Sequence, residues 1–84
     1  MHYSQDQMAE IDILVRYNLQ TMQQGIKVHS NANKEHVEAV KRLFDKGLVT
    51  QIDGGYLTDL GRNAAEHAQA LILILAPHNQ SAAS

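Results

Sequence analysis

Residues 43–61 carry the signals of several successive structural elements within one short segment. Gly47 stands where the C-terminus of a helix needs a residue with positive φ. Residues 48–52 contain β-branched side chains in partial alternation, and the Asp-Gly-Gly sequence at 53–55 is typical of a hairpin turn. Thr58 then offers an N-cap for a following helix. The segment therefore predicts a helix end, a strand, a tight turn, a second strand and a helix start.

This order of elements resembles the wing of a winged helix-turn-helix domain. In that family a Leu precedes a Gly-Leu-Val/Ile sequence, a short β-hairpin follows, and a Tyr or aliphatic residue leads into Leu-Thr-x-x-Gly. The matching residues here are Leu43, Gly47, Leu48, Val49, Tyr56, Leu57, Thr58 and Gly61. The whole chain is also similar to a small proteobacterial family of uncharacterised proteins described as DNA-binding proteins or transcriptional regulators. The resemblance implies a winged-helix-like domain and DNA binding, but one fold hosts many functions and the site has to be argued from its own residues.

Three helices are predicted around the hairpin, which makes the expected fold α+β and mostly helical. A capping box of Ser4 and Gln7 opens a first helix over about Gln5–Gln24. A second helix is predicted over about Ala32–Lys46, and a long third helix over about Asp59–Ala76. Apolar positions at helical spacing form the expected buried stripes. They are Met8, Ile11, Val15, Leu19 and Met22 in the first helix, Ala32, His36, Val37, Val40, Leu43 and Phe44 in the second, and Leu60, Ala64, His67, Ala68, Leu71, Ile74 and Leu75 in the third.

The connection between the first two helices is short for a helix-turn-helix. Ile26 and Val28 alternate with Lys27 and His29, which is compatible with a short strand that pairs with the hairpin. A usual winged helix has two helices between this strand and the wing, whereas this chain has room for one helix and at most one preceding turn. Residues 1–76 are expected to form a single winged-helix-like domain, and 77–84 a disordered tail.

Composition and charge limit the functions that this chain can have. It has 84 residues and no cysteine, which excludes disulfides and thiolate metal sites. The N-terminus lacks the basic-then-apolar order of a signal peptide, and no apolar run is long enough to span a bilayer, so a soluble cytoplasmic protein is expected. The formal net charge is −2, although DNA-binding domains tend to be basic because Lys and Arg neutralise phosphates. A DNA-binding surface would therefore have to be a local patch.

The predicted second helix and the loop before it form the candidate DNA-contact surface. The window from Lys27 to Lys34 contains no acidic residue and is the most basic of the chain. Basic side chains there can contact phosphates or base edges, and Asn at a helix N-terminus can read adenine. The candidates are Lys27, His29, Asn31, Asn33, Lys34, Lys41 and Arg42.

The alternative interpretation of the second helix is a solvated surface with no DNA role. Its outer face is expected to carry three positive and three negative side chains, which can pair at a spacing of four residues. These are Lys34, Glu35, Glu38, Lys41, Arg42 and Asp45. The hairpin tip contains Asp53 and no basic residue, unlike wings that grip DNA. The competing hypothesis is therefore a protein-interaction or dimerisation module with a winged-helix shape.

The five consecutive aliphatic residues from Leu71 to Leu75 are the strongest signal unrelated to DNA. One face of a helix buries only some of them, and the remainder would form an apolar patch of the kind that marks an interface. We therefore predict a two-fold homodimer packed through the C-terminal helix. The expected interface residues are Ala65, Ala68, Leu71, Ile72, Leu75 and Ala76. The β-preference of Ile leaves a β-rich tail as the alternative.

Metal binding and catalysis are not expected, and neither is a cofactor. The five histidines at 2, 29, 36, 67 and 78 include no pair at His-x-x-x-His spacing. The chain has no cysteine nucleophile and no Gly-rich phosphate loop. Glu10, Asp12, Glu35 and Glu38 are expected to be ordinary carboxylates at helix surfaces, with nothing to indicate burial.

Overall fold

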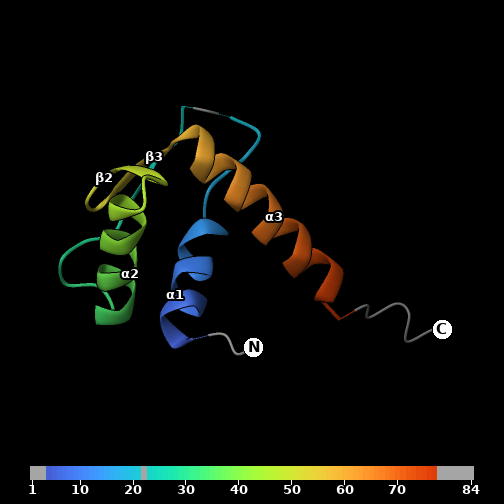
Figure 1. The fold of residues 1–84 in the computed structure, drawn as a ribbon, viewed down its shortest axis with the longest axis horizontal. Coiled ribbons are helices and arrows are strands. Elements are labelled where there is room, and N and C mark those ends of the chain that lie inside the picture. The colour runs from blue at the N-terminus through green and yellow to red at the C-terminus, as the bar shows by residue number, and fades with distance from the viewer. Residues whose placement is uncertain (1–3, 22, 78–84) are drawn as a thin grey trace.

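The computed structural model describes residues 4–21 and 23–77, which fold into three helices and a three-stranded antiparallel sheet (Figure 1). The elements are α1 (Gln5–Leu14), β1 (Ile26–Lys27), α2 (Lys34–Asp45), β2 (Val49–Gln51), β3 (Gly54–Leu57) and α3 (Asp59–Leu75). The expected α+β, mostly helical order is confirmed, including the short strand before α2. The predicted disordered tail lies, apart from Pro77, outside the described residues.

The first helix is shorter than predicted, because side chains from α3 satisfy the carbonyl groups that follow it. The capping box at Ser4 is present as expected, but α1 ends at Leu14 instead of Gln24. The amide of Gln69 donates to the carbonyls of Leu14 at 3.3 Å and Tyr17 at 2.8 Å. The carbonyl groups at the end of α1 thus have hydrogen-bond donors from α3 and do not need further turns of helix to satisfy them.

The predicted apolar stripes were wrong in several places, for two reasons. The helices contact the rest of the domain through small residues: Ala9, Ala39, Gly61 and Ala65 are all buried. Small side chains let helix backbones approach closely, so larger apolar residues beside them are displaced toward the surface. The last turns of α3 extend beyond the core, so the apolar residues there are exposed as well. Of the predicted stripe residues described by the structure, Met8, Ala32, Phe44, Leu60, His67, Leu71, Ile74 and Leu75 are exposed.

The sheet has the order β1-β3-β2, and its geometry depends on two glycines. The turn lies at Ile52-Asp53, one step earlier than expected, and Gly54 and Gly55 belong to β3. Both have positive φ, 129° and 73° respectively. A Cβ at Gly54 would lie 2.6 Å from the carbonyl oxygen of Ile26. Glycine at this position therefore lets β1 pair with the hairpin, which places the loop after β1 beside the turn.

The junction between the hairpin and α3 explains the Thr-x-x-Gly motif in physical terms. Thr58 caps α3 by accepting from the backbone N–H of Gly61 at 3.0 Å, and its hydroxyl donates to the carbonyl of Gly47 at 2.6 Å. Gly61 in turn lies directly against the backbone of Leu48, where a Cβ would stand 1.8 Å from the carbonyl oxygen. The first turn of α3 is thus held against the chain segment that leaves α2.

The core occupies the space between α1, α2, the sheet and the first half of α3. Its fully buried large side chains are Ile13, Val40 and Leu43, joined by Tyr17, whose hydroxyl donates to the carbonyl of Gly55 at 3.1 Å. The second half of α3 projects away from this core, and α3 diverges from α1 toward its C-terminal end (Figure 1).

Candidate nucleic-acid interface

Three of the predicted DNA-binding residues meet around one hollow at the edge of α2. Lys27 and His29 approach it from β1 and the following loop, and Lys41 approaches it from α2. The hollow is open and has a volume of about 370 Å³. Its other lining residues are Val28, Ser30, Val37, Val40, Ile52 and Asp53. The backbone N–H of Val28 donates to the carbonyl of Asp53 at 2.8 Å, so the basic loop is fixed against the hairpin turn.

The predicted residues at the start of α2 are exposed, but they do not all remain available. The side-chain oxygen of Asn33 accepts from the backbone N–H of Glu35 at 2.7 Å, which makes Asn33 the N-cap of α2. Asn31 lies in the exposed turn before it. Lys34, the first residue of α2, precedes Lys41 by seven positions and shares its outward stripe, about 10 Å away along the helix axis.

Arg42 is not part of the outer face of α2, and its prediction as a DNA contact was wrong in this respect. Its guanidinium faces α1, where Nε donates to the carboxylate of Glu10 at 2.7 Å and Nη2 donates to the carbonyl of Asp6 at 3.3 Å. The hydrogen bond to Glu10 raises the pKa of Arg42 further above its usual value. The expected pairs at a spacing of four residues are Lys34–Glu38, Glu38–Arg42 and Lys41–Asp45, and none of them forms within the described residues. Lys41 lies 3.8 Å from Glu38 instead.

Glu10, expected at a helix surface, is buried, with 7% of its surface exposed. Its second carboxylate oxygen accepts from Nζ of Lys46 at 2.6 Å. Burial alone would raise the pKa of Glu10, but the hydrogen bonds from Lys46 and Arg42 outweigh burial and hold this pKa below its usual value. The signal that could have located this partner is the spacing of Arg42 and Lys46, which are four residues apart on one helix face.

Most of the basic side chains have bonding partners within the subunit. Of the seven Lys and Arg residues, four have intramolecular hydrogen-bonding partners: Arg16 binds His36, Arg42 and Lys46 bind Glu10, and Arg62 binds backbone carbonyls. The three that remain are Lys27, Lys34 and Lys41, with Lys41 close to Glu38. A contact with an anionic partner can therefore draw on three lysines per chain, all on or beside α2.

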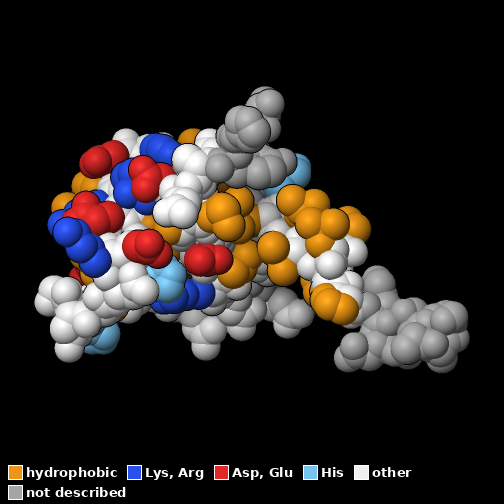
Figure 2. Space-filling model, turned by 90° about the horizontal axis from the view of Figure 1, so that it is seen from below, with side chains coloured by type: hydrophobic (Ala, Val, Ile, Leu, Met, Phe, Trp, Pro, Cys, Tyr) orange, Lys and Arg blue, Asp and Glu red, His pale blue; other side chains and the backbone are white. Residues whose placement is uncertain are grey.

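The face of the molecule that contains the N-terminal ends of α1 and α2 is a patchwork of both charges. Figure 2 shows basic and acidic side chains alternating there, and a gathering of hydrophobic side chains over the C-terminal end of α3. Lys34 takes part in this mixture, since it lines a hollow between α1 and α2 together with Asp6, Glu35 and Glu38. The hollow at Lys27, His29 and Lys41 has more basic than acidic lining residues, with Asp53 as its one acid.

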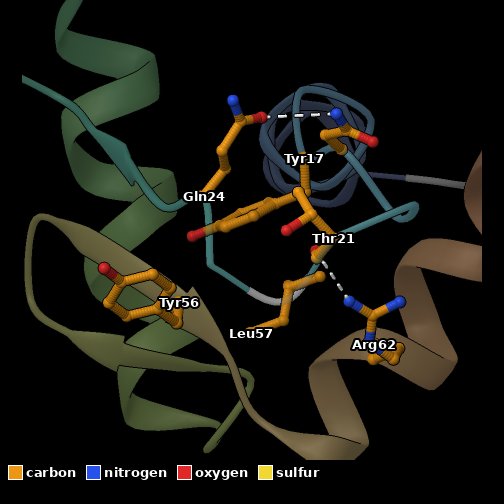
Figure 3. Close-up of a pocket in the computed structure, with 7 residues that line it drawn as sticks. Tyr17, Thr21, Gln24, Tyr56, Leu57 and Arg62 are labelled. Carbon is orange, nitrogen blue, oxygen red and sulfur yellow. Dashed lines mark hydrogen bonds between the residues drawn. The ribbon is translucent and has the colours of Figure 1, made fainter.

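A second cavity, between the loop after α1 and the hairpin, is too small for a ligand. Tyr17, Thr21, Gln24, Tyr56, Leu57 and Arg62 converge on it (Figure 3). Its volume is about 20 Å³, which is roughly the space of a single water molecule. Arg62 serves this region structurally, because its guanidinium donates to the carbonyls of Leu19 at 2.9 Å and Thr21 at 3.2 Å.

Replacing Arg62 with Ala should loosen this loop and destabilise the domain moderately. Two carbonyls lose a charged donor, and hydrogen bonds to charged groups contribute about 1.5–3 kcal/mol each when the partner is buried; partial exposure lowers the expected total to about 2 kcal/mol. Urea unfolding would measure the loss, and hydrogen exchange would locate it in the loop. Gln24→Ala, which removes only the 3.3 Å hydrogen bond from the Asn18 amide, is the control and should change little.

The structure gives no sign of a membrane span or a metal centre within residues 4–21 and 23–77. None of the helices there combines the length and apolar character needed to cross a bilayer. In the same residues, His, Asp and Glu side chains form no group of three or more that could hold a metal ion.

The chain belongs to a family of unknown function, DUF5669, whose model matches residues 1–76. No curated protein and no solved structure matches it. Membership of this family does not indicate an activity, because the family's function is unknown. The function therefore has to be argued from the surface chemistry of the protein.

Proposed function

We propose that this protein is a small DNA-binding protein with a regulatory role, and that it contacts the phosphate backbone as a dimer. The observation that supports this most is the meeting of Lys27, His29 and Lys41 around one hollow beside the hairpin turn. The element order supports it further, because a helix that directly precedes a hairpin, in a sheet of order β1-β3-β2, is the arrangement expected of a winged-helix domain.

The charges of α2 restrict the form that such binding can take. The outward stripe of the helix carries Lys34, Glu38, Lys41 and Asp45, whose charges sum to zero. Base reading by the middle of α2 is therefore disfavoured, and phosphate contacts by its edge and by the preceding loop are favoured. With three available lysines, one chain should give a salt slope of at most about −3, and a pair of chains about −5. A single chain would bind weakly, so the proposal requires a dimer.

A polarisation titration with duplex DNA of random sequence, beginning at low salt, tests the proposal. The variant Lys27→Gln/Lys41→Gln should weaken binding and lower the magnitude of the salt slope by about two per chain. The control Gln20→Glu/Asn63→Glu changes the net charge equally, at exposed positions on the loop after α1 and on α3. If the DNA affinity falls equally in both variants, or in neither, the hollow lined by Lys27, His29 and Lys41 is not a DNA-contact surface.

The second candidate function is a protein-interaction module without a DNA role, and the neutral stripe of α2 is the observation that favours it. Such a module needs exposed apolar surface instead of free lysines, and the end of α3 has that surface. If the protein shows no salt-dependent binding to duplex DNA even at low salt, the interaction module becomes the better account of the fold.

A further inference from the structure

The last turns of α3 form an aliphatic surface that the subunit itself does not cover. The side chains of residues 71–75 are between 48% and 72% exposed. Residues 67–77 include no Lys, Arg, Asp or Glu, although exposed helix ends usually carry such residues. The five side chains together expose on the order of 600 Å², at the upper end of apolar patches on monomeric proteins. Figure 2 shows these hydrophobic side chains gathered over the C-terminal end of α3.

Part of this surface continues along α3 as a stripe, which we name the α3 stripe. Its residues recur at spacings of three and four and therefore share one side of the helix. Its ends are large and exposed. Its middle consists of two alanines that pack partly against the subunit's own core and whose exposed side would let another helix approach closely. The α3 stripe consists of Leu60, Ala64, Ala68, Leu71 and Leu75.

An apolar hollow of about 340 Å³ lies between α1, the C-terminal end of α2 and Leu48. It is lined by Gln7, Glu10, Ile11, Leu14, Leu43, Lys46 and Leu48. Two of these residues contact α3 directly: the carbonyl of Leu14 accepts from Gln69, and the backbone of Leu48 lies against Gly61. The chain therefore presents a projecting aliphatic helix end and an apolar hollow on neighbouring surfaces.

We propose that the partner covering both surfaces is a second copy of this chain. In a two-fold dimer the same patch meets itself. The C-terminal end of each α3 can then enter the apolar hollow of the other copy, while the two α3 stripes cross at their alanines. Leu71, Ile72, Ile74 and Leu75, which share one half of the helix circumference, supply together with Leu60 and the apolar hollow most of the roughly 800 Å² per partner that a stable interface buries, and Leu73 lies on the other side. Ala65, predicted for this interface, is excluded from it, because it is fully buried within its own subunit.

A lipid surface fits this end of α3 less well than a second copy does. Amphipathic helices that lie in a membrane interface carry Lys and Arg along their polar face. The nearest basic residue of α3 is Arg62, whose guanidinium is bonded to the carbonyls of the loop after α1. The absence of charge from residues 67–77 favours a protein partner with an equally apolar surface.

Sedimentation velocity at tens of micromolar, without DNA, tests the dimer. The wild type should sediment at twice the chain mass of 9.3 kDa. The variant Leu71→Glu/Leu75→Glu should be a monomer with unchanged helicity, since both side chains are exposed within the subunit. The matched control is Ala70→Glu/Leu73→Glu, which adds the same charge to the same turns on the opposite side of α3 and should remain dimeric.

Three results would overturn the proposal: a monomeric wild type, a dimer that survives Leu71→Glu/Leu75→Glu, or equal dissociation of both variants. Ile11→Glu probes the apolar hollow and should raise the dissociation constant of the dimer at least about tenfold. If this constant is unchanged, the apolar hollow is not part of the dimer interface. A monomer that cosediments with anionic lipid vesicles would assign the surface to a membrane. The DNA-binding proposal rests on this dimer, but sedimentation without DNA measures dimerisation alone; a dimer that fails to bind DNA in the polarisation titration therefore contradicts the proposed function and not the dimer.

Discussion

Replacing Gly61 with Ala should unfold the domain or leave it barely stable. The new methyl group would stand 1.8 Å from the carbonyl oxygen of Leu48 and 2.8 Å from its carbonyl carbon, where no flexible side chain can move aside. Leu48 cannot shift freely either, because its N–H donates to Leu43 at 2.9 Å and its carbonyl accepts from Thr58 at 3.1 Å. The expected loss is about 3–5 kcal/mol, a large fraction of the total stability of so small a domain.

Urea unfolding followed by circular dichroism would measure this loss. The matched control is Gly47→Ala, which also adds a methyl group to a glycine of this junction. Gly47 has φ of 79°, but a Cβ there meets nothing within 4 Å. Its substitution should therefore cost only the backbone strain of the left-handed region, about 1–2 kcal/mol. If the two variants have equal urea unfolding midpoints, the packing of α3 does not depend on the close approach of Gly61 to Leu48.

Local signals predicted the hairpin, its junctions and the element order, because the physical causes of these features lie close together in sequence. The cap at Ser4, the positive φ of Gly47 and the cap at Thr58 each involve residues at most a few positions apart. The turn was misplaced by one step because Gly54 is required for pairing with β1, and that requirement comes from Ile26, far away in the sequence.

The end of α1 could not be predicted in this way, since it is determined by contacts across the whole chain. Gln69 reaches the carbonyl groups after α1 from α3, and Arg62 holds the loop that follows. Neither side chain carries a local pattern that identifies a carbonyl partner some forty or more positions earlier. Helical periodicity therefore extended the first helix through a segment that the structure uses as a loop.

The candidate DNA-contact surface was predictable only in part. The basic window that begins at Lys27 was visible in the sequence, and the structure brings Lys41 to it across the hollow. The contact of Arg42 with α1 was missed, because a helical wheel places Arg42 near the outer face of α2. Only its spacing of four residues from Lys46 could have indicated a shared acidic partner. That acid, Glu10, looked like an ordinary surface residue for the same reason.

Replacing Glu10 with Gln should destabilise the protein by about 2–3 kcal/mol at neutral pH. The amide keeps the size of the side chain but removes the charge that faces Arg42 and Lys46, leaving two cations beside a group that cannot neutralise them. This expected loss of stability is smaller than for a fully buried ion pair, because the side chains of Arg42 and Lys46 are 29% and 52% exposed. Glu66→Gln, an exposed carboxylate on α3, is the control and should be close to neutral.

The difference between wild type and Glu10→Gln should depend on pH, in a direction that follows from the lowered pKa of Glu10. A carboxyl whose pKa is lower in the folded than in the unfolded chain stabilises the fold above the unfolded pKa, and this contribution is lost as the pH falls through the folded value. The wild type should therefore lose its advantage below pH 4.5, the ordinary value for Glu. Urea unfolding at neutral and at acidic pH measures this convergence. If the two proteins differ as much in acid as at pH 7, the carboxylate charge is not what holds α1 against α2.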